Sequence, residues 1–512
     1  MDDKGPNRRD LIQGAALLGA GAALLRPEAL LAQTGPMAAI RKAAAAGKEA
    51  SVKRIRDWIA LPSIAAENRN MKEGADYFAN LLREAGFQHA EVVPTKGHPG
   101  VFGTYDVGAK RTLGLYMMYD VKQIEPPGEW TSPALEGKLV ERKGLGTVMI
   151  GRGSVNHKGP EAAFLAALHA IRAAGQKLPV NLVLVCEGEE EIGSPNLRQL
   201  VSHPKVLAAL RKCEGVFMPT NLQDRSGGAS IELGAKGMVE LELVVSGAKW
   251  GKGPTSDVHS SLKAIMDSPV WRLVQVLQTL VTPDGNRPAI DGWFENVRLL
   301  TDRQKARIRE NVRHSAGGQV DMLAGGSGIN RLIDNMNPEE SQIRLMQDPT
   351  VNIEGLVAGY TGPGGKTILP HRAVAKLDLR LVPDQTHEEA VRKLRAHLDK
   401  RGYKDVEMNV SGGYDPTETD ENSLLIRAEI ATYRKLGIRP NLNVRLAGSW
   451  PGGYFTQPPV SQPVGRFGLG TGGAAHAPDE WLLIDSTDPK VAGLVDATMG
   501  YVEFLHTFAS MK

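Results

Sequence analysis

Apolar positions recur with a helical period in some segments of the chain and form short unbroken runs in others. Between residues 50 and 87 they follow helical spacing, and Gly86 stands where such a helix would end. Residues 180–186 form an apolar run that is typical of a strand buried on both faces. Further strands are expected at 90–93, 100–104 and 112–119, and a helix at 159–174. Strands that alternate with helices favour an α/β fold.

A different pattern begins near residue 237. Apolar and polar residues alternate at 238–246, as in an open sheet with one face in water. Helices are expected to follow at 265–281 and 387–402, with strands at 373–382 and 405–410. The first pattern then returns, with helices at 423–436 and 488–508. We therefore expect an α+β domain at 237–412, inserted into a first domain made of 34–236 and 413–512.

The first 33 residues have the order of features that is typical of a targeting segment: paired arginines followed by a short apolar run. Arg8 and Arg9 precede an apolar run at 15–25, which is shorter than the roughly 20 residues that a bilayer-spanning helix needs. This order predicts a twin-arginine export signal at residues 1–33, and an amphipathic helix is the alternative. With the signal removed, the mature protein would be periplasmic or secreted. We find no second apolar run long enough for a membrane span, so the mature form is not expected in the membrane.

Composition excludes several classes of partner. The 512 residues include 61 Lys and Arg against 58 Asp and Glu, and a net charge of +3 gives no reason to expect nucleic acid as a partner. Aromatic residues make up 5%, which argues against a stacking platform for single strands. Cys186 and Cys213 are too few for a cysteine-rich metal site. We expect two separate buried thiols, and a single disulfide after export is the alternative.

Four polar motifs lie at the ends of expected strands, where catalytic groups of open α/β sheets gather. They are LYMMYDV at 115–121, GRGSVNHKG at 151–159, EGEEEIGS at 187–194 and GGAAHAPDE at 472–480. Neighbouring carboxylates raise one another's pKa, so the glutamates at 187–191 suit a general base beside a metal ligand. A solvated acidic loop is the alternative for that motif taken alone.

In order and spacing, these motifs resemble the dinuclear-zinc hydrolases of metallopeptidase family 20, which include carnosinase, acetylornithine deacetylase, succinyl-diaminopimelate desuccinylase and glutamate carboxypeptidase. The resemblance extends from about residue 50 to 508 and includes DVHS at 257–260, TILP at 367–370, RLVP at 380–383 and RLAGSWP at 445–451. It implies a catalytic domain with a mixed, mainly parallel sheet flanked by helices. It also implies that the inserted α+β domain is a lid and dimerisation domain.

The resemblance implies five metal ligands, of which this chain keeps Glu191 and His476. Met118 stands where the family has a histidine, and Asn156 stands where it has a bridging aspartate. A further carboxylate or imidazole is expected after the next strand, where only Thr220 or Asn221 is available. His157 and Asp224 are the alternative substitutes.

These replacements change what the site is able to bind. Zinc sites need about four N, O or S ligands, and a methionine thioether is a soft ligand that prefers Cu(I). A neutral asparagine does not bridge two dications, whose repulsion would be poorly compensated. We therefore do not expect a di-zinc centre. Three possibilities stay open: one divalent metal, zinc foremost, on Glu191 and His476; no metal, with an acid–base set of Glu190, Asp120, His476 and His259; or a cleft that only binds.

The remaining roles are carried over from the resemblance residue by residue. Glu190 matches the general base and Asp120 is kept beside it, while His259 matches a lid histidine that stabilises the oxyanion, often across a dimer interface. Arg380 matches a clamp for a substrate carboxylate, a role that suits its bidentate guanidinium. Asn156 and Ser449 are further candidate substrate contacts.

The sequence as a whole predicts an exported hydrolase that cleaves an amide or peptide bond. Its substrate would be a small molecule with a carboxylate, a dipeptide or an N-acyl amino acid, and its metal dependence would be atypical or reduced. We expect a homodimer formed through the lid domain. A periplasmic binding protein on a degenerate hydrolase scaffold is the alternative, and different chemistry in the same cleft is a third possibility.

Overall fold

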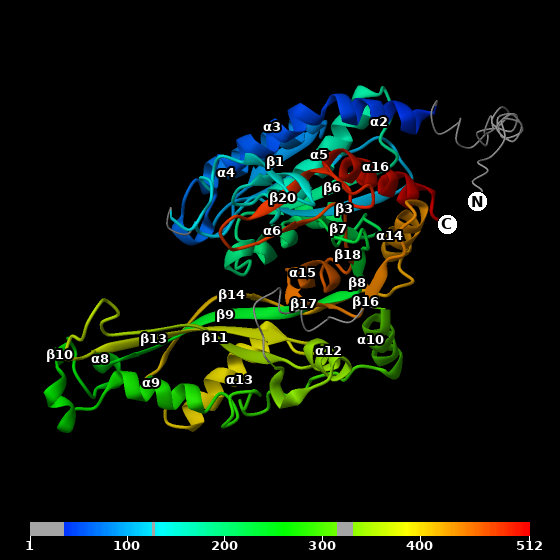
Figure 1. Ribbon diagram of the computed structural model, residues 1–512. Helices are drawn as coiled ribbons and strands as arrows, with labels where there is room; N and C mark the ends of the chain where they lie inside the picture. Colours follow the sequence, from blue (N-terminus) through cyan, green and yellow to red (C-terminus); the bar gives the residue numbers. More distant parts are fainter. Residues whose placement is uncertain (1–34, 125–127, 315–330) are drawn as a thin grey trace, which may run out of the picture.

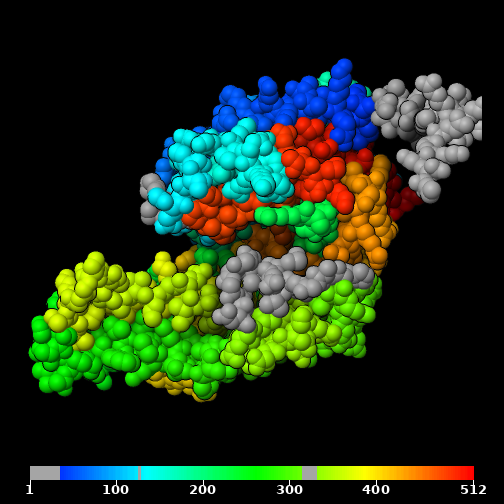
Figure 2. Space-filling model, in the orientation of Figure 1, coloured from blue at the N-terminus to red at the C-terminus, as the bar shows by residue number. Residues whose placement is uncertain are grey.

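The computed structural model describes residues 35–124, 128–314 and 331–512, and the expected export signal at 1–33 lies outside them. Two layers are visible in Figure 1: an α/β domain that contains both ends of the described chain, and an elongated lid domain beneath it. Figure 2 shows that the lid, coloured green and yellow, extends well beyond the first domain on one side.

A six-stranded sheet in the order β1-β2-β6-β3-β7-β18 forms the centre of the first domain. β1 and β2 pair antiparallel with each other and β2 pairs antiparallel with β6, whereas β6, β3, β7 and β18 are parallel. The predicted mixed sheet is confirmed. The strands are β1 (His89–Val93), β2 (Gly100–Tyr105), β3 (Thr112–Met118), β6 (Asn181–Glu187), β7 (Val216–Pro219) and β18 (Val464–Phe467).

Helices pack around α5, whose residues are buried on almost every side. Such a helix belongs to the interior rather than to an amphipathic surface. α2, α3, α4 and α16 all contact it, and α14 packs on α16. These helices are α2 (Pro36–Ala46), α3 (Lys48–Ile59), α4 (Met71–Ala85), α5 (Lys158–Ala173), α14 (Leu424–Lys435) and α16 (Leu494–Ser510). Cys186 and Cys213 are buried free thiols, as expected.

A four-stranded sheet in the order β19-β20-β5-β4 was not predicted from the sequence. Its strands are β4 (Lys138–Arg142), β5 (Gly146–Ile150), β19 (Gly472–Gly473) and β20 (Trp481–Ser486). β5 ends directly before the motif at 151–159, and β20 begins directly after the motif at 472–480. Their antiparallel pairing, with Trp481 opposite Ile150, brings these two distant motifs together.

The lid contains a sheet in the order β11-β13-β9-β14, all antiparallel. β9 (Gly234–Ser246) and β14 (Glu407–Tyr414) connect it to the first domain, and β11 (Thr350–Ala358) and β13 (Arg372–Leu381) complete it. The expected limits at 237 and 412 lie inside β9 and β14. Apolar side chains of α9 (Pro269–Gln278) and α13 (His387–Lys400) cover one face of the sheet.

The lid also has elements that the sequence patterns did not reveal. They are α10 (Asp302–His314), α12 (Pro338–Gln347), β11, and β10 (Val258–His259), which pairs with β12 (Ile368–Leu369). In the part of the chain that the structure describes, we find no helix with the length and apolarity that a bilayer crossing requires.

Candidate active site

The loops after β3 and β6 meet at one edge of the central sheet. The two strands are parallel neighbours, with Met118 opposite Glu187, so both chains leave the sheet on the same side. The Asp120 side chain is fully buried there, and its Oδ2 accepts a hydrogen bond from the Glu191 backbone N at 3.0 Å. Glu190 and Glu191 lie in the short helix η2 (Glu190–Ile192) beside it. The structure thus brings these three predicted residues together.

Glu191 is the centre of a contact cluster that includes Asn156 and His476. Its Oε1 accepts a hydrogen bond of 2.7 Å from Asn156 Nδ2, and its Oε2 lies 3.3 Å from His476 Nε2. Asn156 Nδ2 is also 2.9 Å from His476 Nε2. The Glu191 side chain is 3% exposed and that of His476 is 52% exposed, so the cluster opens to solvent on the His476 side.

A buried glutamate holds the loop that carries Asn156. Glu480 Oε1 accepts hydrogen bonds from the backbone N of Val155 and of Asn156, each at 2.9 Å. Glu480 Oε2 accepts from Gly153 N at 3.1 Å and from Arg152 Nη1 at 2.9 Å. Sequence reasoning did not single out this pair. The sequence could have indicated it, because Arg152 and Glu480 lie inside two of the four motifs.

Burial and mutual repulsion change the acidity of the site. Burial raises the pKa of Asp120 to about 8, and the Glu191 carboxylate adds to this rise. Burial also raises the pKa of Glu190 well above its ordinary value, with further contributions from Glu191 and Asp120. A carboxylate with a raised pKa is suited to take a proton from water near neutral pH.

Lys122 faces these carboxylates, and the sequence reasoning missed it. Lys122 Nζ donates a hydrogen bond to the Glu191 carbonyl O and lies 3.6 Å from Glu191 Oε2. Burial by itself lowers the pKa of Lys122, but Glu191 and other nearby carboxylates raise it above its ordinary value. The ammonium is therefore charged at neutral pH. Its only sequence signal was its position two residues after Asp120.

Arg380 and Ser449 lie together where the lid joins the first domain. Arg380 Nη1 donates to Ser449 Oγ at 2.8 Å, and Arg380 Nε donates to Asp378 Oδ2 at 2.9 Å. Ser449 ends β17 (Leu446–Ser449), which pairs with β9, and its Oγ donates to the Gly237 carbonyl at 3.3 Å. The Arg380 side chain is 29% exposed.

His259 is not brought to the other candidate residues within one chain. It is exposed on β10, and Figure 1 places β10 at the end of the lid farthest from the first domain. Its Nδ1 contacts Ser261 Oγ at 2.8 Å.

The comparisons with known proteins decide the family. The sequence pattern of the peptidase family M20/M25/M40 matches residues 115–499. The chain belongs to this family. The Cys-Gly metallodipeptidase DUG1 of Saccharomyces cerevisiae is 25% identical over 462 residues, which cover 85% of this chain and 91% of that protein. This M20 chain is therefore a peptide hydrolase by family, and the predicted resemblance is confirmed.

Solved M20 structures have the same architecture. The metallo-carboxypeptidase Sso-CP2 of Sulfolobus solfataricus superposes with a TM-score of 0.78 at 31% identity, covering 90% of this chain and 99% of that one. Human carnosine dipeptidase 1 gives a TM-score of 0.76 at 22% identity, covering 93% and 100% of the two chains, which shows the fold alone. The α/β fold with mixed sheets is confirmed.

The alternative ligands do not restore an M20 metal centre. The His157 side chain is half-buried, and in the part of the chain that the structure describes it belongs to no group of three possible metal ligands. Asp224 Oδ1 accepts hydrogen bonds within its own turn, from the backbone N of Ser226 at 2.7 Å and of Gly228 at 3.0 Å. Thr220 Oγ1 lies 3.4 Å from Arg466 Nη2. Within residues 35–124, 128–314 and 331–512, no three His, Cys, Asp or Glu side chains are grouped as a metal site. The donor set does not fit a two-metal centre.

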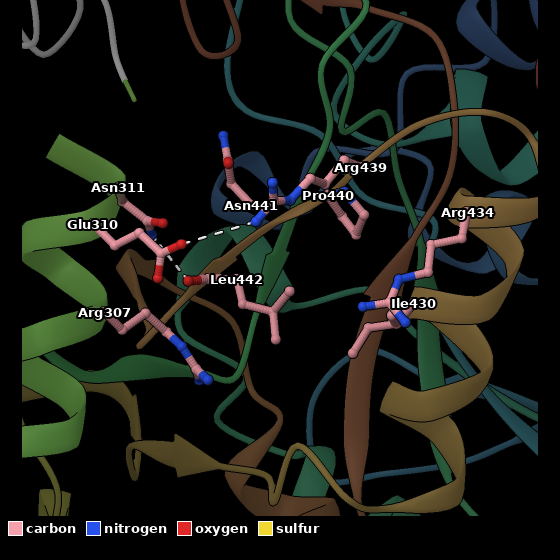
Figure 3. A pocket seen from close by; sticks show the side chains of 9 residues that line it. All are labelled: Arg307, Glu310, Asn311, Ile430, Arg434, Arg439, Pro440, Asn441 and Leu442. Atoms are coloured by element: carbon pink, nitrogen blue, oxygen red, sulfur yellow. Dashed lines mark hydrogen bonds and ion pairs between the residues drawn. The ribbon is translucent and has the colours of Figure 1, made fainter. Parts of the chain in front are cut away.

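The structure also has a cavity of about 240 Å³ outside this site, between α10 of the lid and α14 of the first domain (Figure 3). Arg307, Arg434 and Arg439 line it, but Arg307 pairs with Glu421, and Arg439 Nη2 lies 3.9 Å from Glu310 Oε1. None of the predicted site residues lines this cavity.

Proposed function

We propose that this chain hydrolyses the peptide bond of dipeptides, or the amide bond of N-acyl amino acids, that carry a free carboxylate. The observation that carries the proposal is the grouping of Glu190, Asp120 and Glu191 at one sheet edge, with the Arg380 and Ser449 pair at the junction with the lid. The names of its relatives support the substrate class, since they include Cys-Gly metallodipeptidase and Beta-Ala-His dipeptidase.

The chemistry follows from the residues of the chain. Glu190 takes a proton from water as the water oxygen attacks the substrate carbonyl carbon, and it later returns that proton to the leaving nitrogen. Arg380 binds the substrate carboxylate through two parallel hydrogen bonds and so orients the scissile bond. Asn156 and Ser449 complete the substrate contacts. If one divalent metal binds, Glu191 and His476 hold it, and metal dependence is reduced relative to the family.

Replacing Arg380 by alanine tests the carboxylate clamp. We expect KM for a dipeptide to rise about 10- to 100-fold, because a hydrogen bond to a charged group contributes about 1.5–3 kcal/mol. Arg372→Ala, on the opposite end of β13, is the matched control and should leave KM unchanged. Steady-state kinetics on a dipeptide and on its C-terminal amide make the measurement. Equal KM changes for the two substrates would contradict the assignment.

We further propose a homodimer through the lid, in which His259 of one copy completes the site of the other. The exposed position of His259 at the distal end of the lid supports this arrangement. Mixing inactive His259→Ala with inactive Glu190→Gln protein should restore up to about a quarter of the wild-type activity, because each mixed dimer has one intact site. Each variant measured alone is the control. A mixture that stays inactive although its subunits exchange would contradict action in trans.

Twin-arginine export to the periplasm or beyond is also proposed, on the strength of the paired arginines and the short apolar run. Changing both Arg8 and Arg9 to lysine should retain the protein in the cytoplasmic fraction, measured by immunoblotting of fractionated cells. An unchanged distribution would contradict this route.

A further inference from the structure

The Glu191 carboxylate has protein partners on both of its oxygens. Oε1 accepts from Asn156 Nδ2 at 2.7 Å, and Oε2 lies 3.3 Å from His476 Nε2 and 3.6 Å from Lys122 Nζ. An ionised carboxylate only accepts hydrogen bonds, so the Asn156 group that faces it is the amide NH₂. That group has no lone pair to offer a metal ion. Asn156 therefore joins the two remaining family ligands by hydrogen bonds at the place where the family has a bridging carboxylate.

Lys122 brings a full positive charge to the same carboxylate. Its Nζ contacts both the carbonyl O and the side chain of Glu191, and its side chain is 28% exposed. Glu190, Glu240 and Asp120 are close enough to act on it electrostatically. In a partly buried site such a charge acts more strongly than at the surface, because water screens it less.

A second cation lies beside a replaced ligand position. Arg466, 15% exposed, places Nη2 3.4 Å from the hydroxyl of Thr220, where the family resemblance implies a carboxylate or an imidazole. Arg466 Nη1 lies 3.9 Å from Glu232 Oε2, which faces it from β8 (Ser230–Glu232). One positive side chain therefore lies beside the kept ligand Glu191, and another lies beside the replaced position at Thr220.

We propose that Lys122 supplies, without a metal ion, the positive charge that this hydrolytic site needs, and that Asn156 holds Glu191 and His476 in place of a bridged metal pair. The inference rests on the proposed function. As the water oxygen bonds to the carbonyl carbon, the carbonyl electron pair moves onto its oxygen, which the Lys122 ammonium stabilises. Glu190 takes the water proton and passes it to the nitrogen when the electron pair on the oxygen re-forms the carbonyl and the carbon–nitrogen bond breaks.

Metal content and chelator sensitivity of the purified full chain test the proposal first. We expect elemental mass spectrometry to find far less than one equivalent of zinc, manganese, cobalt or nickel, and dipeptide hydrolysis to be unchanged by EDTA. About one equivalent of metal that is lost in Glu191→Ala, together with inhibition by EDTA, would overturn the proposal and leave the proposed function intact. Absence of hydrolysis with and without added zinc would instead overturn the proposed function.

Variants of Lys122 separate its charge from its packing. Lys122→Met should lower kcat about 100- to 1,000-fold with little change in KM, the loss typical of removing one oxyanion-stabilising group. Lys122→Arg should recover part of kcat because it keeps the charge. Lys177→Met, at an exposed lysine after α5, is the matched control. Equal kcat values in Lys122→Met and wild type would contradict the role.

Restoring the family donors gives a readout that does not depend on activity. The double variant Met118→His, Asn156→Asp should gain zinc binding in isothermal titration calorimetry, whereas the wild type shows none. Because Met118 is fully buried and a histidine in its place could disturb folding, Asn156→Asp alone is the second variant, and it should bind zinc more weakly than the double variant. Wild-type protein that binds zinc as tightly as the double variant would overturn the proposal.

Discussion

Glu190→Gln is expected to lower kcat by about 100- to 10,000-fold, which is the contribution of a positioned general base. Glutamine keeps the size of the side chain but does not take a proton from water. Steady-state hydrolysis of a dipeptide measures the loss, and an unchanged melting temperature shows that the fold is intact. The pH dependence of wild-type activity is a second expected result. Glu190 must be ionised to take a proton, and its pKa is raised. Activity should therefore be lost on acidification at a higher pH than for a glutamate with an ordinary pKa.

Glu189→Gln is the matched control for this experiment. Glu189 lies next to Glu190, but its carboxylate accepts from His98 N at 2.8 Å and from Asn196 Nδ2 at 2.8 Å, outside the cluster of Asp120 and Glu191. Its replacement should leave kcat close to the wild-type value. Normal turnover in Glu190→Gln would contradict the mechanism.

The alternative of a binding protein predicts a different result for the wild type. A wild-type protein that binds dipeptides, seen as a rise in melting temperature, but hydrolyses none would favour that alternative.

Glu480→Ala is expected to destabilise the fold by about 3–5 kcal/mol, the loss typical of removing one partner of a buried ion pair. The side chains of Glu480 and Arg152 are each 1% exposed, and Glu480 also accepts the backbone hydrogen bonds of the loop that carries Asn156. Alanine would leave the backbone N–H groups of Val155 and Asn156 without their Glu480 acceptor. Urea unfolding followed by circular dichroism measures the free energy of unfolding.

Two control variants show whether the lost stability comes from the buried Glu480 contacts. Glu480→Gln keeps an acceptor oxygen for the backbone N–H groups and should cost less than Glu480→Ala. Asp76→Ala removes the exposed ion pair of Asp76 with Lys72, whose side chains are 49% and 80% exposed, and should leave the unfolding curve unchanged. Equal stability of Glu480→Ala and wild type would show that the pair does not hold the loop.

Several helices and strands of the first domain could be predicted from local patterns because each of them has its own apolar spacing. The strand predicted from the apolar run at 180–186 is β6, and the helix predicted at 159–174 is α5. Both patterns can be recognised within one short segment, without knowledge of the distant residues that pack on it. β4 was missed for the opposite reason. Its residues are largely exposed, and it exists as a strand because it pairs with β5, which in turn pairs with β20.

The sequence by itself determined the family, through the order and spacing of its four motifs. The motifs that carry Asp120 and Glu191 end neighbouring parallel strands, which must meet at one sheet edge, whereas those that carry Asn156 and His476 meet through the antiparallel pair β5 and β20. Asp120, Glu190, Glu191, Asn156 and His476 were all named from those motifs. Only the tertiary structure decided what surrounds them. The contacts of Lys122 with Glu191, of Glu480 with the Asn156 loop and of Arg380 with Ser449 join segments far apart in the chain. Such contacts depend on how sheets and domains pack, which no local spacing of residues records.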